Sequence, residues 1–388
     1  MSQLHFSEAI PLSLYVHIPW CLKKCPYCDF NSHAQKEQGL PEQRYIEALL
    51  KDLELSVPLV WGRTVSSIFI GGGTPSLFSA ESINTLLSGI RSLVKLTPNA
   101  EITLEANPGT FESEKFADFA NTGINRLSIG IQSLEDKHLV QLGRVHDAEQ
   151  ALAAYQTARI AGFTNINLDM MYALPEQSLA EAQQDLERLI DLEPEHISWY
   201  QLTLEPNTLF HKYPPVLPDH ELSAQISETG QTLLANAGYH QYEVSAYARN
   251  GKECQHNKNY WEFGDYLGIG AGAHGKLTQP ANQQITRTSK PRQPEHYMQF
   301  IDAGSLETPQ AIPEQDLAFE FFLNSLRLND GISTTLFEQR TGMKINTVAA
   351  TLDRLRDRGL LNNHATQIQT TPTGQRFIDE MTPEFLKS

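Results

Sequence analysis

The stretch that decides the fold lies near the N-terminus, where residues 12–28 read LSLYVHIPWCLKKCPYC. It begins with a run of mostly apolar and β-branched residues, which is typical of a strand buried on both faces of a parallel sheet. Three cysteines follow at the spacing Cys21-x3-Cys25-x2-Cys28. The predicted strand therefore places three thiols in the loop at its carboxyl end.

Three thiolates this close together can hold a metal centre. Zinc usually takes four ligands, and His33 would complete a Cys₃His set. A four-iron cluster normally takes four cysteines, so three of them leave one iron open to a substrate or cofactor. Spacing alone leaves three alternatives open: an iron–sulfur centre, a zinc site, or three cysteines without a metal.

Strand-like runs recur along the first half of the chain, with helical patterns between them. We predict strands at residues 12–18, 67–70, 101–106, 126–130, 165–171 and 196–204. Apolar residues at helical spacing predict amphipathic helices at 41–55 and 179–192. This alternation indicates a parallel sheet, and six such units predict an α/β fold, a partial TIM-like (β/α)6 barrel with its chemistry at the carboxyl ends of the strands.

The remainder of the chain departs from this alternation. Four prolines between residues 206 and 218 mark a surface connection, after which a helix at 220–236 and a strand-like run at 241–247 are expected. The polar segment 276–296 is interpreted as a loop with solvated charges. A winged-helix outline follows, with helices at 319–328, 333–341 and 346–358 and a hairpin at 360–371. We therefore expect a barrel domain at 1–240, an extension at 241–310 and a small winged-helix-like α+β domain at 311–388.

Charge and composition exclude several classes of function. The 388 residues carry 30 Lys and Arg against 46 Asp and Glu, a net charge of −16, so a nucleic-acid backbone would be repelled over most of the surface. Residues 311–388 are also slightly acidic, with eight basic and ten acidic side chains, which argues against a DNA-reading winged helix. No apolar run is long enough to cross a membrane. Without a signal-peptide pattern or a disulfide framework, the chain is expected to be cytoplasmic.

Polar side chains stand at or just beyond the predicted strand ends, namely Glu105, Gln132, Arg144 and Asp169. A glycine-rich turn, GGGTP at 71–75, follows the second predicted strand. Glycines let the backbone approach a ligand closely, although a tight strand exit is the commoner reason for them. Ordinary hydrogen bonding at the mouth of a barrel would account equally well for each polar residue taken alone.

Together these motifs resemble the signature of radical S-adenosylmethionine (SAM) proteins. The resemblance rests on the cysteine spacing, with Tyr27 before the last cysteine, and on the GGGTP turn. It implies that Cys21, Cys25 and Cys28 hold a [4Fe–4S] cluster whose open iron binds the methionine end of SAM. The residues that the resemblance implies for SAM binding are Tyr15, Gly72, Gly73, Thr74, Glu105, Gln132, Arg144 and Asp169.

The sequence context narrows the resemblance to the oxygen-independent coproporphyrinogen III oxidase family. It extends from about residue 12 to the C-terminal domain through the motifs IFIGGGTPSLF, ITLEANPGT, RLSIGIQS, LGRVH, NLDMMYALP, SWYQLTLEPNT and GIGAGAHG. Within the family the chain is most similar to the HemW-type heme chaperones. The oxidases carry a fourth cysteine two residues after the third and a longer N-terminal extension, whereas here Phe30 stands at that position and 20 residues precede Cys21.

A second motif, HNKNYW at 256–261, fits the H-N-x-x-Y-W pattern of the chaperone branch. The resemblance implies that His256 binds heme, and a neutral imidazole is a good axial ligand of heme iron. The alternative is a structural histidine with both ring nitrogens satisfied. Cys254 is interpreted as a small buried residue. Arg287, Lys290 and Arg292 are candidates for pairing with heme propionates, although we expect a solvated loop there.

These observations predict a heme chaperone that carries a [4Fe–4S] cluster and SAM and delivers heme to haemoproteins of the respiratory chain. Because such acceptors lie at the membrane, the resemblance implies peripheral attachment through partner proteins. It also implies that cluster and SAM serve in regulation or homodimer formation. One alternative is an oxidase-like radical SAM enzyme of tetrapyrrole metabolism, and another is a structural zinc protein.

Overall fold

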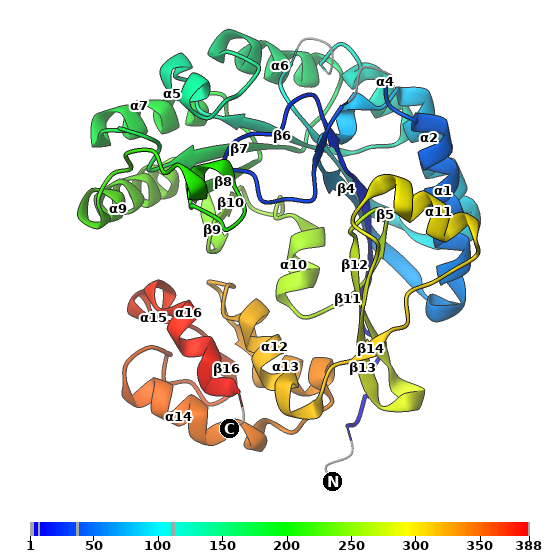
Figure 1. The fold of residues 1–388 in the computed structure, drawn as a ribbon. Coiled ribbons are helices and arrows are strands. Elements are labelled where there is room, and N and C mark those ends of the chain that lie inside the picture. The colour runs from blue at the N-terminus through cyan, green and yellow to red at the C-terminus, as the bar shows by residue number, and fades with distance from the viewer. Residues whose placement is uncertain (1–3, 7, 36–38, 110–112, 387–388) are drawn as a thin grey trace.

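The computed structural model describes residues 4–6, 8–35, 39–109 and 113–386 (Figure 1). Six parallel strands lie side by side in a curved sheet, in the order in which they occur along the chain. They are β1 (Leu12–Ile18), β4 (Thr64–Gly72), β5 (Lys95–Ala106), β6 (Arg126–Gln132), β7 (Ile166–Tyr172) and β8 (His196–Gln201). Each predicted strand is present, and the predicted partial barrel is confirmed.

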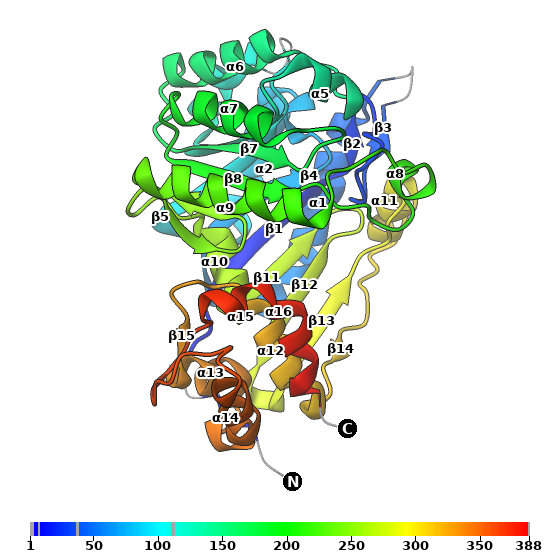
Figure 2. The same ribbon diagram turned by 90° about the vertical axis from the view of Figure 1, so that its left-hand side faces the viewer.

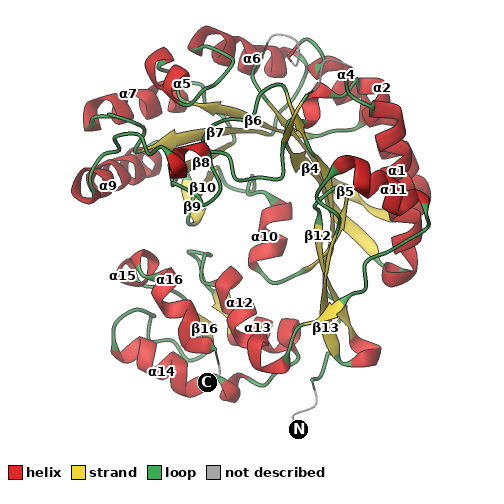
Figure 3. Cartoon of the chain, viewed as in Figure 1, coloured by secondary structure: helices red, strands yellow, loops and turns green. Residues whose placement is uncertain are grey.

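The helices that follow these strands along the chain lie on the outer side of the curved sheet, as Figure 3 shows. They are α1 (Glu42–Ser56), α2 (Ala80–Leu93), α4 (Phe116–Thr122), α5 (Asp136–Gln141), α6 (Ala148–Ile160), α7 (Leu179–Ile190) and α9 (His220–Asn236). One apolar core includes residues from both layers, and Leu49, Ile70 and Leu104 are fully buried within it. Burial of a side chain of this size contributes roughly 1.5–3 kcal/mol before conformational entropy is counted.

The start of α7 shows how local sequence sets the bounds of an element. The Ser178 hydroxyl accepts a hydrogen bond from the backbone N–H of Glu181, and the Glu181 carboxylate accepts one from the backbone N–H of Ser178. This reciprocal cap satisfies two backbone donors and stabilises a helix by about 1 kcal/mol. The helix in the structure therefore begins at the predicted residue, Leu179, and ends at Ile190, two residues before the predicted end.

Both edges of the parallel sheet are extended by further strands. Beside β1 lie β11 (Asp265–Ile269), β12 (His274–Gln279), β13 (Gln284–Ser289) and β14 (Gln310–Ala311), of which β11 is parallel to β1. Beside β8 lie β10 (Ala246–Ala248) and β9 (His240–Glu243). These strands pair the backbone groups that an open barrel would leave exposed at its edges. A short separate pair, β2 (Trp20–Cys21) with β3 (His33–Ala34), frames the cysteine loop.

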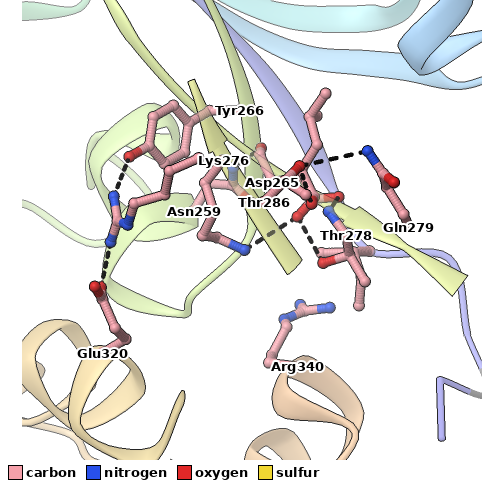
Figure 4. A network of polar contacts seen from close by, with 12 residues as sticks. Asn259, Asp265, Tyr266, Lys276, Thr278, Gln279, Thr286, Glu320 and Arg340 are labelled. Carbon is pink, nitrogen blue, oxygen red and sulfur yellow. Dashed lines mark hydrogen bonds and ion pairs between the residues drawn. The ribbon is translucent and has the colours of Figure 1, made fainter. Parts of the chain in front are cut away.

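The prediction of a loop at 276–296 is wrong, because β12, β13 and helix α11 (Pro294–Asp302) occupy this segment. Four of its polar side chains, Lys276, Thr278, Thr286 and Lys290, are buried instead of being solvated. Lys276 Nζ donates to the Asp265 carboxylate at 3.0 Å, and the Thr278 hydroxyl donates to the same carboxylate at 2.9 Å (Figure 4). The prediction assumed that a polar segment is exposed to solvent, and this assumption fails for strands whose polar side chains are buried.

The C-terminal domain has its own apolar core, built around Phe321, Phe322 and Phe337. Its elements are α12 (Leu317–Ser325), β15 (Ile332–Ser333), α13 (Thr334–Thr341), α14 (Ala349–Asp357), β16 (Gln367–Ile368), α15 (Pro372–Arg376) and α16 (Ile378–Met381). The predicted winged-helix outline of three helices and a hairpin is present, with Leu361 bridged to Thr370 in the hairpin. Figure 2 shows this domain at the end of the molecule away from α6 and α7.

Two short helices lie near the mouth and the open side of the barrel. α8 (Leu209–Lys212) follows β8, and α10 (Gln255–Trp261) lies between the barrel strands and α12 (Figure 1). None of the helices within the described ranges is long and apolar enough to cross a membrane.

Candidate cofactor site at the carboxyl ends of the barrel strands

The three cysteines of the loop after β1 line one cavity of about 340 Å³ at the carboxyl ends of the strands. All three thiols are free and partly exposed. The Arg144 guanidinium donates to Cys25 Sγ at 3.6 Å, and the Ser32 hydroxyl lies 3.7 Å from Cys28 Sγ. A guanidinium and a hydroxyl thus lie beside two of the three thiols.

The three thiols do not converge on one point as the ligands of a single ion do. Within the described ranges, no three His, Cys, Asp or Glu side chains lie close enough together to hold one metal ion. His33, on β3, is not among the residues that line the thiol cavity. In a four-iron cluster each thiolate binds a different iron, so the thiols surround a volume instead of meeting at a point. The structure thus gives no support to the Cys₃His zinc alternative.

The glycine turn after β4 packs directly against the root of the cysteine loop. The backbone N–H of Gly73 donates to the Ile18 carbonyl at 2.8 Å, and that of Thr74 donates to the Trp20 carbonyl at 2.7 Å. A Cβ on Gly73 would lie 2.5 Å from the Trp20 oxygen, and Gly72 adopts a φ of +117°. Glycine is therefore required here by the close contact between two loops of the chain itself.

Glu105, near the end of β5, is the charged group at the centre of the site. Its carboxylate accepts a hydrogen bond from the Gly72 backbone N–H at 3.0 Å. Burial raises its pKa to about 7, an effect opposed by that hydrogen bond and reinforced by Asp169. No cation among the described residues forms a hydrogen bond with it, although Arg126 acts on it from further away. Because a buried carboxylate without a paired cation is costly, this position suits a ligand that brings a positive charge. The residues present therefore fit the ammonium group of a methionine-type ligand.

The other polar residues predicted at the strand ends line the same cavity. Arg144 is held by the Asn107 side chain at 2.7 Å and by the Gly130 carbonyl at 2.8 Å. Gln132 has a left-handed φ of 71° and accepts a hydrogen bond from the Tyr200 hydroxyl at 2.8 Å.

Asp169 lies on β7 in the same cavity, and burial raises its pKa. Its carboxylate accepts hydrogen bonds from Ser128 at 3.1 Å and Asn167 at 2.8 Å. The tertiary structure thus brings together residues from five segments that are distant in the sequence.

Several residues of this cavity escaped the sequence analysis: Asn107, Ser128, Ser198 and Tyr200. Asn107 directly follows β5 and Tyr200 lies next to the last residue of β8, so the strand-end criterion that selected Glu105 would have found these two. Ser128 and Ser198 lie further back, each as the third residue of its strand, and that criterion does not reach them. Their residue types are common in any loop, and only their shared location marks them as part of the site.

A second, larger cavity of about 590 Å³ adjoins the first, and both are lined by Phe30, Gly72 and Glu105. Phe30, which stands where the oxidases carry a fourth cysteine, is 65% exposed. Tyr15 also lines the larger cavity, and its hydroxyl lies 2.9 Å from His17 Nδ1.

Aromatic and basic side chains make up much of the wall of the larger cavity, among them Tyr260, Trp261, Tyr266, His274, Arg287 and Arg292. All six come from 241–310, the segment between the barrel and the winged-helix-like domain. This composition suits a ligand with a large apolar surface and negative charges.

The structure separates the residues of the HNKNYW motif. Tyr260 and Trp261 line the larger cavity, whereas His256 is buried beside it and lines neither cavity. His256 Nδ1 lies 3.1 Å from the Ser67 hydroxyl, and its Nε2 lies 2.9 Å from the Tyr260 hydroxyl. Burial, together with Arg126, lowers its pKa to about 3, so the ring is neutral. Ligation of heme iron by His256 stays a prediction, and it would require the Tyr260 contact to open.

Cys254 and the basic residues of 276–296 are also placed by the structure. Cys254 is fully buried, and its thiol donates to the Glu101 carboxylate at 3.5 Å. Lys290 is not solvated, because it forms a buried ion pair with Asp52 at 2.5 Å. Arg287 pairs with Glu320 of the C-terminal domain, so the expectation of solvated charges holds for neither of these two residues.

Comparison with known proteins agrees with this architecture. The sequence model of the Radical SAM superfamily matches residues 15–189, and that of the HemN C-terminal domain matches residues 312–377. The coproporphyrinogen III oxidase structure from Escherichia coli superposes with a TM-score of 0.82 at 26% identity, covering 98% of this chain and 91% of that chain. The barrel and its three-cysteine loop thus define a radical SAM protein, a class that implies a [4Fe–4S] cluster and SAM.

The similarity to curated sequences is closer still. Heme chaperone HemW of Escherichia coli (strain K12) is 49% identical over 376 residues, which cover 97% of this chain and 98% of that protein. Heme chaperone HemW of Bacillus subtilis (strain 168) is 33% identical over 383 residues, which cover 96% and 99%. The chain belongs to the HemW family of heme chaperones.

Proposed function

We propose that this protein is a heme chaperone that binds heme in the larger cavity and passes it to acceptor haemoproteins. The observation that carries the proposal is the position of this cavity, which has aromatic and basic walls and adjoins the thiol cavity at Gly72 and Glu105. Its volume of about 590 Å³ lies within the range of cavities that take cofactor-sized ligands, roughly 300–1,000 Å³. The names of the HemW relatives support the same ligand.

The cavity beside it would hold the [4Fe–4S] cluster on Cys21, Cys25 and Cys28. A bound cluster supplies an open iron for the amino and carboxylate groups of SAM. We assign Glu105 to the ammonium group of SAM, because its carboxylate is buried and has no cationic partner within hydrogen-bonding distance in the described part of the chain. Arg144, held by Asn107 and Gly130, would bind a carboxylate.

The remaining polar residues would orient the rest of SAM. Gln132 and Asp169 are assigned to the ribose or nearby groups, since both line the thiol cavity. Gly72, Gly73 and Thr74 form its floor through the turn that packs on the cysteine loop. The position of Tyr15 at the adjoining cavity supports a place beside the cofactor.

The acceptors are proposed to be haemoproteins of the respiratory chain, reached by a cytoplasmic protein that attaches peripherally through its partners. A net charge of −16 disfavours direct binding to anionic lipid, so contact with the membrane would be made through protein. A homodimer is proposed as the state that cluster and SAM control. Light scattering of the reconstituted protein with and without SAM tests the dimer directly.

The test of function is anaerobic reconstitution with iron and sulfide, followed by a heme titration and transfer to an apo-haemoprotein. A chaperone binds heme stoichiometrically and releases it to the acceptor faster than heme exchanges through solution. If the reconstituted protein takes up no heme, the chaperone proposal is wrong.

The similarity to the coproporphyrinogen III oxidase structure makes an oxidase the second candidate. Phe30 at the position of the fourth cysteine disfavours it. Incubation with a reductant, SAM and coproporphyrinogen III separates the two functions. Formation of protoporphyrinogen at a catalytic rate would establish the oxidase, whereas its absence together with heme transfer supports the chaperone.

A further inference from the structure

Three histidines lie in or beside the larger cavity, and they differ in what their rings contact. His17 is held at both nitrogens, by the Tyr15 hydroxyl and by the Asn31 carbonyl, each at 2.9 Å. His256 is likewise held at both nitrogens and lines neither cavity. His274 lines the cavity, its side chain is exposed, and neither ring nitrogen has a hydrogen-bond partner among the described residues.

The backbone of His274 is fixed even though its ring is free. It is the first residue of β12 and pairs with Ser289 of β13. A Cβ on Gly268 of β11 would lie only 1.9 Å from the His274 carbonyl oxygen, which shows how closely the two strands approach. The fixed backbone thus presents to the cavity an imidazole whose ring nitrogens are open to a ligand, and a neutral imidazole nitrogen is a common metal ligand.

The surroundings of His274 disfavour protonation of the ring and supply positive charge nearby. Burial lowers its pKa, and Arg287 and Arg292 lower it further. Arg287 is already paired with Glu320 and with the Tyr266 hydroxyl, residues that Figure 4 shows on facing elements. Arg292 lines the cavity with an exposed side chain and makes no ion pair with any described residue. A guanidinium of this kind is free to bind a carboxylate of the ligand.

The aromatic wall completes the match to a heme group. Tyr260 and Tyr266 pack edge to face, with ring centroids 4.4 Å apart, and Trp261 and Phe30 line the same cavity. An apolar macrocycle requires such a surface, its iron requires a neutral nitrogen ligand, and its propionates require cations.

We propose that the iron of heme in this cavity is bound by the imidazole of His274, and that a heme propionate pairs with Arg292. The assignment rests on the proposed heme-binding function and gives it a particular site. In this arrangement His256 is a positioning residue, which holds the Tyr260 hydroxyl and thereby the aromatic wall.

The experiment is a heme titration of the full-length, reconstituted protein, followed by absorbance and electron paramagnetic resonance. His274→Ala should lose the histidine-ligated spectrum and bind heme about 10- to 100-fold more weakly, the range typical when a metal site loses a supporting group. Added imidazole should restore the spectrum, and His274→Met should raise the heme reduction potential, as a thioether ligand does. His220→Ala, which removes an exposed histidine on α9 that lines neither cavity, is the matched control and should leave binding unchanged.

Heme dimethyl ester tests the second contact. The wild-type protein should prefer heme to the ester, which lacks propionate charge, and Arg292→Ala should abolish this preference. Failure of the wild-type protein to bind heme would count against the proposed function as a whole. Heme binding with an unchanged spectrum and affinity in His274→Ala would overturn this site alone, and loss of the spectrum in His256→Ala would then move the ligand to His256.

Discussion

The carboxylate of Glu105 accepts a hydrogen bond from the backbone N–H of Gly72 at the place where the two cavities of the protein meet. The contact links the ends of two neighbouring barrel strands, β5 and β4. Through it, the group proposed to bind SAM lies at the wall of the cavity proposed to bind heme. Changes at Glu105 are therefore informative about both ligands.

Binding of SAM should depend on pH through Glu105. Burial and Asp169 raise the pKa of this carboxyl, the Gly72 N–H and Arg126 lower it, and the pKa that results is about 7. Only the ionised form attracts an ammonium group, so SAM affinity should rise as the pH increases from about 6 to about 8. Equilibrium dialysis of SAM against the reconstituted protein measures this. In Glu105→Gln the affinity should be lower and the rise lost, and an unchanged pH profile in this variant would contradict the assignment.

Loss of one cysteine of the loop should abolish the cluster. Cys25→Ala leaves two thiolates and removes the sulfur that Arg144 contacts, so we expect little bound iron and sulfide after reconstitution. Chemical analysis of both elements gives the answer. The matched control is Cys254→Ala, because that thiol is buried against Glu101 and should not affect cluster content. Full iron content in Cys25→Ala would refute the cluster assignment.

Removal of one partner from the buried ion pair of Lys290 and Asp52 should destabilise the fold. Their charged atoms lie 2.5 Å apart, and the Tyr297 hydroxyl donates to the same carboxylate at 2.8 Å. Lys290→Met leaves Asp52 without its cation, which typically costs about 3–5 kcal/mol of unfolding free energy. Urea denaturation followed by circular dichroism measures the loss. The control is Arg44→Ala, which breaks an exposed ion pair with Glu295 and should lower the free energy of unfolding by at most about 1 kcal/mol. Equal losses of unfolding free energy in the two variants would contradict the argument from burial.

Replacement of His256 should weaken heme binding without changing the way the iron is ligated. His256→Ala removes the partner of the Tyr260 hydroxyl, so the aromatic wall is held less firmly and the heme affinity falls. At saturating heme the absorbance spectrum should match that of the wild-type protein, and the cluster should remain intact. Tyr260→Phe, which removes only the hydroxyl, should reproduce part of the effect. An altered spectrum at saturation would show that His256 is itself a ligand.

The barrel was predictable because its signals are local. Apolar runs such as 12–18 and 126–130, helical apolar spacing and the cap at Ser178 all act over a few residues. The cysteine motif is local as well, since three thiols within one loop reach one cavity whatever the rest of the chain does. The strand-end rule then placed Glu105 and Asp169 in the same cavity, because the carboxyl ends of parallel strands meet at one side of a barrel.

The extension and the larger cavity could not be predicted in this way. The burial of Lys276 depends on Asp265, and that of Lys290 depends on Asp52, a partner 238 residues away in sequence. A single sequence gives no sign of such pairs, so both lysines were expected in solvent.

The sequence by itself determined the barrel, the thiol loop and the family resemblance, because these rest on residue type and short spacing. Only the tertiary structure decided which histidine has a free ring. His256 lies in a motif with a predicted role but is saturated by Ser67 and Tyr260. His274 lies in the GIGAGAHG motif, for which no ligand role was predicted, and it faces the cavity without a hydrogen-bond partner among the described residues. The physical reason is that the availability of a ligand atom depends on what surrounds it in space, and those neighbours come from distant parts of the chain.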